Sequence, residues 1–157
     1  KGDYIYLGEI GLMADVDGMG KGVYRLSPWY AENGALGQTG EGVTFSFEQE
    51  LAIDAAVFGR VAAANRRRTD IEAFVGGGIV FTKPFGFDRD QIGIAAGAGI
   101  PSDDDNRNYT YLVESYWQMQ LTERFEFGPD IQVHIKPAAD RDRDVLFVGG
   151  LRCMMRF

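Results

Sequence analysis

Polar side chains of five kinds, carboxylates, amides, guanidiniums, one imidazole and one phenol, recur at alternate positions along this chain. The set of interest is Glu48, Glu50, Arg60, Glu114, Tyr116, Gln118, Asp130, Gln132, His134 and Arg152. Such groups replace the hydrogen bonds that a polar solute makes with water, and two carboxylates on one face can also act as a general acid and base. The sequence therefore allows either solute binding or catalysis, and the surrounding elements decide between them.

Catalysis finds little support in the residues. Glu48 and Glu50 share a face, but a glycosidase needs its carboxyl pair in a closed site with perturbed acidity, and nothing in the sequence supplies one. His134 is the only histidine and has no cysteine near it, which is typical of a wall residue rather than of a metal ligand or general base. No Ser/His/Asp arrangement stands in an obvious order. We expect no enzyme, no bound metal and no cofactor.

The elements that carry these residues are strands. Between Phe125 and Lys136 the apolar residues occupy one parity and the polar residues the other, and successive side chains of a strand face opposite sides. The pattern predicts an all-β, antiparallel fold of about nine strands. The expected strands are Asp3–Ala14, Val23–Glu32, Gly42–Leu51, Ala55–Ala64, Ile71–Thr82, Gln91–Ile100, Tyr109–Gln120, Phe125–Pro137 and Asp144–Phe157. Pro28 removes a ladder hydrogen bond, which predicts an edge strand or a bulge there.

Length and composition exclude several classes of protein. The chain has 157 residues, a net charge of −7 and a pI of about 4.7, which argues against nucleic-acid binding. Its single cysteine, Cys153, excludes an internal disulfide and a zinc site built on cysteines. No apolar run approaches the ~18 residues of a membrane helix, whereas a strand crosses a bilayer in about 9–11 residues. The chain begins at Lys1 without a signal peptide, so we expect a processed protein or a fragment.

Alternation alone does not tell whether the apolar face meets a protein core or lipid. Tyr109, Tyr111 and Trp117 lie near strand ends on that face, as interfacial aromatic girdles do. The connections after every second strand are long and polar, ENGALGQTGEG, NRRRTD, PSDDDNRN and KPAADRDRD, and most of the others are tighter. Transmembrane barrels sort their connections in this way. The sequence thus favours a transmembrane β-barrel.

Three stretches resemble segments of a known family. ESYWQMQLTERFEFGPDIQVHIKP, followed by a strand that ends at Phe157, resembles the last hairpins of the carbohydrate-selective porin family of Gram-negative outer membranes, the OprB type. FSFEQELAIDAAVFGRVA is similar to the family's glutamate–glutamine strand and the Phe-Gly-Arg strand after it, and IGIAAGAGIP fits the next hairpin. The order of these segments, rather than any single motif, carries the resemblance.

The resemblance implies an outer-membrane channel that passes sugars. It also implies a barrel of roughly sixteen strands, so residues 1–157 are expected to form one barrel domain that is the C-terminal portion of such a porin. We expect the ten polar residues above to face the lumen, with Glu48 and Arg60 on a hairpin neighbouring the one that carries Glu114 and Asp130. The resemblance further implies that the terminal Phe157 belongs to a signal read by barrel-assembly machinery.

Several alternatives stay open at this stage. The polar residues are equally compatible with a solvated wall or with charge pairs that brace the barrel. The barrel itself is compatible with a closed or plugged form that has a structural or ligand-binding role, or with a non-selective general porin. An outer-membrane enzyme is a third class. Asp103–Asp105 is compatible with a divalent ion, and Arg66–Arg68 with lipopolysaccharide. The sequence determines neither the sugar nor whether the barrel is a monomer or a trimer.

Overall fold

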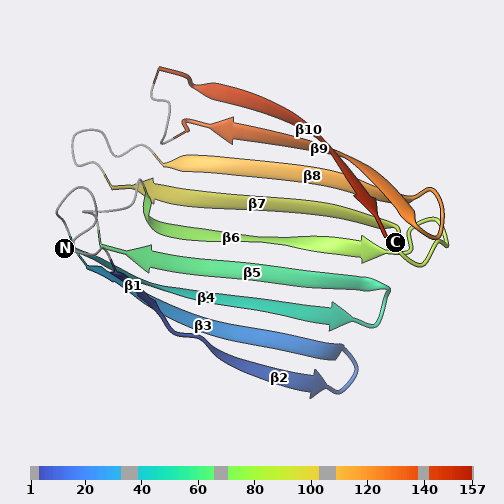
Figure 1. Ribbon diagram of the computed structural model, residues 1–157, viewed down its shortest axis with the longest axis horizontal. Helices are drawn as coiled ribbons and strands as arrows, with labels where there is room; N and C mark the ends of the chain where they lie inside the picture. The colour runs from blue at the N-terminus through green and yellow to red at the C-terminus, as the bar shows by residue number, and fades with distance from the viewer. Residues whose placement is uncertain (1–3, 33–38, 66–70, 103–108, 138–141, 157) are drawn as a thin grey trace.

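The computed structural model describes residues 4–32, 39–65, 71–102, 109–137 and 142–156, and these form one antiparallel sheet (Figure 1). Neighbouring strands follow chain order from β3 to β10, while β1 and β2 both pair with β3. The all-β antiparallel prediction is confirmed. The described residues include no helix that is long and apolar enough to cross a membrane. The strands are β1 (Tyr4–Leu7), β2 (Ile10–Val16), β3 (Gly20–Glu32), β4 (Gly40–Leu51), β5 (Ala55–Ala64), β6 (Ile71–Thr82), β7 (Gln91–Pro101), β8 (Thr110–Gln120), β9 (Phe125–Ile135) and β10 (Val145–Met155).

The strand count differs from the prediction at one place, and Pro28 explains it. The predicted first strand is divided into β1 and β2 at Gly8 and Glu9, opposite Pro28 of β3. The Gly8 N–H still donates to the Pro28 carbonyl at 3.0 Å, but Pro28 has no N–H to return the bond, so the ladder lapses. The expectation of an edge strand or a bulge was wrong. β3 lies between β1/β2 and β4, and the pairing has the same register on both sides of the gap, Leu7 with Trp29 and Ile10 with Leu26.

The connections divide into two groups at opposite ends of the strands (Figure 1). At the end that we call the turn end, residues 17–19, 52–54, 83–90 and 121–124 join successive strands. At the loop end, the four connections include residues 33–38, 66–70, 103–108 and 138–141, which lie outside the described residues. The predicted sorting is confirmed in placement, because the strand ends that flank the four long polar segments all lie at one end of the sheet. At the turn end the connections are short, except for residues 83–90.

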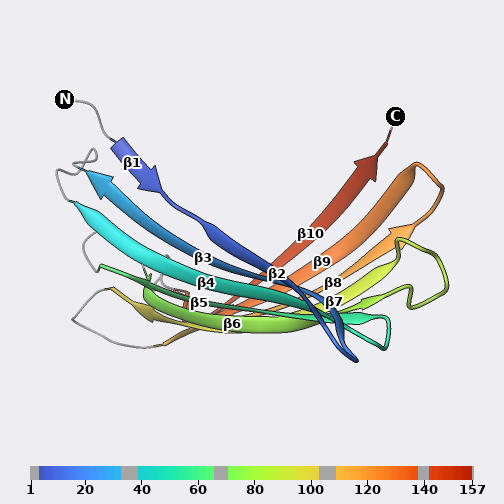
Figure 2. The same ribbon diagram turned by 90° about the horizontal axis from the view of Figure 1, so that it is seen from below.

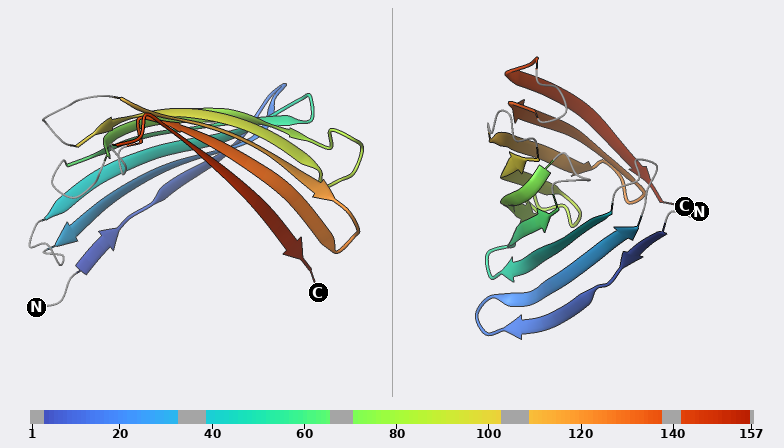
Figure 3. Two further views of the ribbon diagram at one scale, coloured as in Figure 1. Left: turned by 90° about the horizontal axis from the view of Figure 1, so that it is seen from above. Right: turned by 90° about the vertical axis from the view of Figure 1, so that its left-hand side faces the viewer.

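The sheet is strongly curved and open. Figures 2 and 3 show the strands bending together into a trough, with β1/β2 at one rim and β10 at the other. Residues that pair across adjacent strands share a face, so the register divides the sheet into a concave and a convex side. We call a set of residues that pair successively from strand to strand a row. One row on the concave side consists of Arg25, Ser46, Arg60, Gly76, Gly97, Leu112 and His134. From β3 to β9 the predicted polar parity is therefore the concave parity.

Within the described residues, no second layer of protein packs on the convex side. Ala31 and Ala55 are the buried apolar residues of the described chain, at 4% exposed, and no large side chain is fully buried. Phe147 and Leu151 on β10 are 72% exposed, and Ile131 on β9 is 60% exposed. A single curved sheet cannot form a core by itself, because each apolar face needs a second layer to remove it from water. The convex side must be covered by something other than the described part of this chain.

Candidate functional site

The concave side holds a hollow of about 550 Å³ that extends from β3 to β8. The polar residues at its walls come from four strands: Arg25, Ser46, Glu48, Arg60, Glu114 and Tyr116. Alternation within each strand places these side chains on one face, and the curvature of the sheet then turns them toward one another. The hollow therefore has two charged flanks, one on β3–β5 and one that begins on β8 and continues beyond the hollow onto β9 and β10. The hairpin β6–β7 separates the two flanks.

The first flank is organised around Arg25. Its Nη1 lies 3.1 Å from Glu48 Oε1 on β4, and its Nε lies 4.0 Å from Glu9 Oε1. Ser27 Oγ donates a hydrogen bond to Glu9 Oε2 at 3.1 Å. The side chains of Arg25 and Glu48 remain 36% and 64% exposed. Arg60 is also exposed, one row closer to the loop end than Glu48.

The second flank gathers the predicted residues of β8, β9 and β10. Glu114 interacts with Asp130, Gln132 and Arg152, and Gln132 Nε2 donates to Asp130 Oδ1 at 3.3 Å. The other carboxylate oxygen of Asp130 is buried without a hydrogen-bond partner. His134 Nε2 lies 3.3 Å from Gln132 Oε1. These contacts form a continuous polar network whose members are half-buried, apart from the more exposed Arg152.

The two flanks are farther apart than the sequence suggested. Glu48 and Arg60 were expected on a hairpin next to the one that carries Glu114 and Asp130, and that expectation was wrong, because the complete hairpin β6–β7 lies between them. Glu48 and Glu114 share a row but are four strands apart, about 19 Å along the sheet at ~4.8 Å per strand. The flanks thus face one another across a floor.

The floor of the hollow, on β6 and β7, consists of glycines covered by aromatic rings from other positions. A Cβ added at Gly97 or Gly76 would lie 2.7 Å from the Phe74 ring, and at Gly78 it would lie 2.7 Å from the Phe58 ring. At Gly93 the nearest atom of the Tyr116 ring would be 2.2 Å away. The glycines therefore give the rings room to lie against the backbone. Gly93, Gly97 and Gly99 leave one face of β7 nearly without side chains, and nothing in the sequence indicates which rings cover it.

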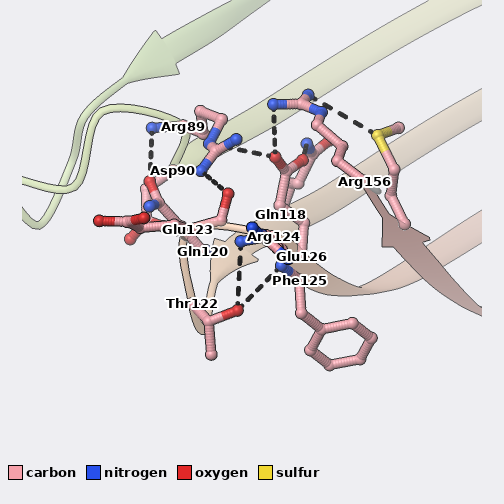
Figure 4. Close-up of polar contacts among 11 residues, drawn as sticks. Arg89, Asp90, Gln118, Gln120, Thr122, Glu123, Arg124, Phe125, Glu126 and Arg156 are labelled. Atoms are coloured by element: carbon pink, nitrogen blue, oxygen red, sulfur yellow. Dashed lines mark hydrogen bonds and ion pairs between the residues drawn. The ribbon is translucent and has the colours of Figure 1, made fainter.

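A compact polar cluster lies at the turn end of the same concave face, and we call Arg89, Gln118, Glu126 and Arg156 the turn-end cluster (Figure 4). Glu126 is 2% exposed, and its Oε1 lies 3.3 Å from Arg89 Nε and 3.2 Å from Arg156 Nη1. The Gln118 amide donates to Glu126 Oε2. Gln118, predicted as a pathway residue, is thus packed within an ionic cluster below the hollow.

Backbone contacts extend this cluster to two turns and the last strand. Asp90, which is 3% exposed, accepts a hydrogen bond from the backbone N–H of Gln120 at 2.6 Å. Arg89 donates to the Glu123 carbonyl, and the Arg156 N–H donates to the Arg124 carbonyl at 2.9 Å. The 83–90 and 121–124 turns and the end of β10 are therefore joined (Figure 4). Glu50, also predicted for the pathway, lies at this end of β4 and accepts the Lys21 N–H at 3.1 Å.

Comparisons with known proteins identify the family of this chain. The family model of the carbohydrate-selective porins, OprB family, matches residues 13–157. The chain belongs to this family. No curated protein matches the chain. Among solved structures, the high-pH structure of Pseudomonas putida OprB matches at 16% sequence identity and a TM-score of 0.78, over 96% of this chain and 48% of that chain. That likeness shows the fold, and this chain spans about half the length of the P. putida protein.

The convex side of this porin-family sheet carries aromatic pairs at both ends. At the loop end, Tyr6 lies against Tyr30 and Tyr109 against Tyr111, with ring centroids 6.3 and 6.4 Å apart. At the turn end, Phe85 lies against Trp117 at 5.3 Å, while Tyr24 and Phe47, 6.4 Å apart, lie nearer the middle of β3 and β4. The expected position of Tyr109, Tyr111 and Trp117, near strand ends on the apolar face, is confirmed. Aromatic bands of this kind mark the two interfaces of a membrane.

Sequence reasoning missed three functional features and left others without a test. It did not single out Arg25, although the alternation of Tyr24 and Leu26 with Arg25 and Ser27 already places Arg25 on the polar face. It also missed the rings of Phe58 and Phe74 and the link from Arg89 to Glu126, which join segments distant in sequence. Asp103–Asp105, where a divalent ion was considered, and Arg66–Arg68, where a lipopolysaccharide contact was considered, lie outside the described residues. In the described residues, no group of three or more acidic, histidine or cysteine side chains is placed to hold a metal ion.

Proposed function

We propose that this chain forms part of the wall of a channel in the bacterial outer membrane through which sugars diffuse passively. The observation that carries the proposal is the division of one sheet into two faces. Large apolar side chains such as Ile131, Phe147 and Leu151 stand exposed on the convex side, while charged residues gather around a hollow on the concave side. Lipid is the covering that suits an apolar band between two aromatic girdles, and water suits the opposite face.

The charge distribution supports a neutral solute. Each flank carries both signs: Arg25 and Arg60 accompany Glu48 on one side, and on the other Glu114 interacts with Asp130 and Arg152, which lie beyond the hollow. A wall of one sign would concentrate counter-ions and repel co-ions, whereas mixed signs leave a small net field along the passage. Hydroxyl-rich sugars can exchange hydrogen bonds with all of these groups without transferring charge. Family membership likewise indicates a channel rather than an enzyme.

The proposed pathway uses the predicted residues according to their position. Glu48, Arg60 and Glu114 would hydrogen-bond sugars in the hollow, and Tyr116 would meet them there with its ring. Asp130, Gln132, His134 and Arg152 would hydrogen-bond sugars beside the hollow. Glu50 and Gln118 would border the passage below it, near the turn end. Weak binding suits all of them, because a solute must leave each site as readily as it enters.

The proposed domain organisation follows from the same considerations. We infer that residues 1–157 are one barrel domain and the C-terminal portion of a porin, in which further strands complete the wall. An open sheet in lipid leaves the backbone groups at its two rims unsatisfied, so closure by those strands is required. The match to about half of the P. putida chain supports this organisation.

Planar-bilayer conductance of the complete porin, with glucose titrated into the bath, tests the proposal. We expect stepwise channel openings whose conductance falls as glucose binds in the passage. Arg60→Ala, Glu114→Gln and Asp130→Asn should each weaken this block. Conductance that no sugar changes would indicate a non-selective porin, and correctly folded protein without conductance would overturn the transport proposal in favour of a closed barrel.

A further inference from the structure

Three aromatic rings follow one another along the floor of the hollow, from the loop end toward the turn end. The Phe74 ring lies over Gly76 and Gly97, and these two glycines belong to the row of Arg60. Phe58 lies over Gly78, one row below, in the row that also contains Glu48 and Glu114. Tyr116 lies over Gly93, one row lower again. Successive rows on one face are about 6.8 Å apart along a strand, so the rings form a continuous series.

The rings come from three different strands, and all three line the hollow. Each ring has backbone beneath it, yet each residue is only half-buried, so part of every ring is open to the hollow. The glycines below make this arrangement specific, because a Cβ at Gly93 or Gly97 would occupy the position of a ring atom. An apolar strip thus runs through a hollow whose flanks are charged.

We propose that Phe58, Phe74 and Tyr116 form a stacking track for the pyranose rings of sugars in transit. This inference rests on the proposed function and assigns the class of solute that the passage recognises. A pyranose has apolar C–H faces and a rim of hydroxyl groups, which match an aromatic floor between hydrogen-bonding flanks. Glu48 and Arg60 border the strip on one side and Glu114 on the other, so a stacked sugar would meet polar groups at its rim.

The track predicts a preference for ring-shaped solutes that flanks alone would not give. In the complete porin, glucose and the open-chain polyol mannitol are titrated separately against single-channel conductance. Both carry hydroxyl groups for the flanks, but only glucose has a ring face for the floor. We expect glucose to block the native channel at lower concentration than mannitol. This comparison needs no variant.

Single substitutions then locate the preference. Phe58→Leu, Phe74→Leu and Tyr116→Leu should each raise the glucose dissociation constant by about 3- to 10-fold, the equivalent of one lost aromatic contact, and leave the mannitol block unchanged. Tyr116→Phe keeps the ring and should retain native glucose affinity. Phe147→Leu removes a ring from the exposed convex side and serves as the matched control. Native-like conductance without sugar shows that each barrel has folded, and three separate variants keep the test valid if one fails to assemble.

The outcomes separate the track from the general function. If glucose blocks the native channel but no better than mannitol, or if all folded leucine variants keep native glucose affinity, the track is wrong while sugar passage stands. If neither solute blocks the native channel, the sugar-binding function fails and the track fails with it. Loss of glucose block in the leucine variants, with Tyr116→Phe and Phe147→Leu unchanged, would establish the track.

Discussion

The turn-end cluster and the charged flanks of the hollow lie on one face and contain the same residue types, yet they differ in how their charges are satisfied. Glu126 is 2% exposed and lies between the guanidiniums of Arg89 and Arg156. The Arg25–Glu48 pair has a similar separation of 3.1 Å, but its side chains are 36% and 64% exposed. The geometry of an ion pair therefore does not reveal its role in this sheet.

Burial distinguishes a structural charge from one that can serve a passing solute. A carboxylate enclosed by two cations has already exchanged its water for protein partners, and removing one partner leaves an uncompensated charge. An exposed pair retains water that a sugar hydroxyl can replace, and contributes little to stability. We infer that the turn-end cluster fixes the last strand and two turns, while the flanks remain open for transport.

The largest predicted effect concerns Glu126. Glu126→Gln keeps the shape of the side chain but leaves Arg89 and Arg156 without an anion. We expect the free energy of unfolding to fall by about 2–4 kcal/mol. This is less than the cost of breaking a fully buried ion pair, because the Arg156 side chain is half-exposed. Urea unfolding of the complete porin in detergent measures it, with Glu48→Gln as the matched control. Equal stability of the two variants would remove the distinction between the regions.

The next effect tests the floor of the hollow. Gly93→Ala places a Cβ where the Tyr116 ring lies, and we expect a destabilisation of about 1–3 kcal/mol from overpacking. Gly149→Ala is the control, because a Cβ there meets no atom within 4 Å, and its effect should be within about 0.5 kcal/mol. A Gly93→Ala protein as stable as the control would show that the ring is not held against the backbone.

A smaller effect is expected on ion selectivity. Arg60 is exposed at the hollow, so Arg60→Glu reverses a charge that passing ions meet. The ratio of cation to anion permeability should rise about 2- to 5-fold at low salt and less at high salt, because counter-ions screen the charge. Reversal potentials in a potassium chloride gradient measure the ratio. Arg124→Glu, in the 121–124 turn, should change it less, and an equal change in both variants would contradict the account.

The smallest effect concerns the exposed pair itself. A double-mutant cycle with Arg25→Gln and Glu48→Gln should give a coupling energy of about 0.2–1 kcal/mol, as exposed ion pairs do. The two single variants should therefore unfold at nearly the native urea concentration. A coupling above about 2 kcal/mol would place this pair with Glu126 as a structural element.

Much of the fold follows from local pattern, which the sequence contains in full. Alternation gives the strands, their antiparallel order and their faces, because a strand has a period of two and short turns join neighbours. Pro28 shows the limit. The sequence shows that Pro28 lacks an N–H. Only the strand pairing shows that β3 continues through Pro28, whereas the strand beside it is interrupted between β1 and β2.

The candidate site was predictable in composition but not in arrangement. Alternation places Glu114, Asp130 and Arg60 on one face, yet it does not give the separation of the flanks, which depends on how many strands lie between them and on curvature. The contact of Phe74 with Gly97, and that of Arg89 with Glu126, join positions on different strands or turns. Such contacts require a known register, and no periodicity within one segment encodes it.

The central claim is that the concave face meets water and the convex face meets lipid, and cysteine labelling along β8 tests it most directly. In a Cys153→Ser background, single cysteines replace Leu112, Glu114 and Tyr116 on the concave parity, and Val113, Ser115 and Trp117 on the convex parity. The complete porin in lipid vesicles is then treated with a small charged thiol reagent. We predict rapid labelling at 112, 114 and 116 and protection at 113, 115 and 117. Labelling of the opposite parity, or equal labelling of both, would contradict the account.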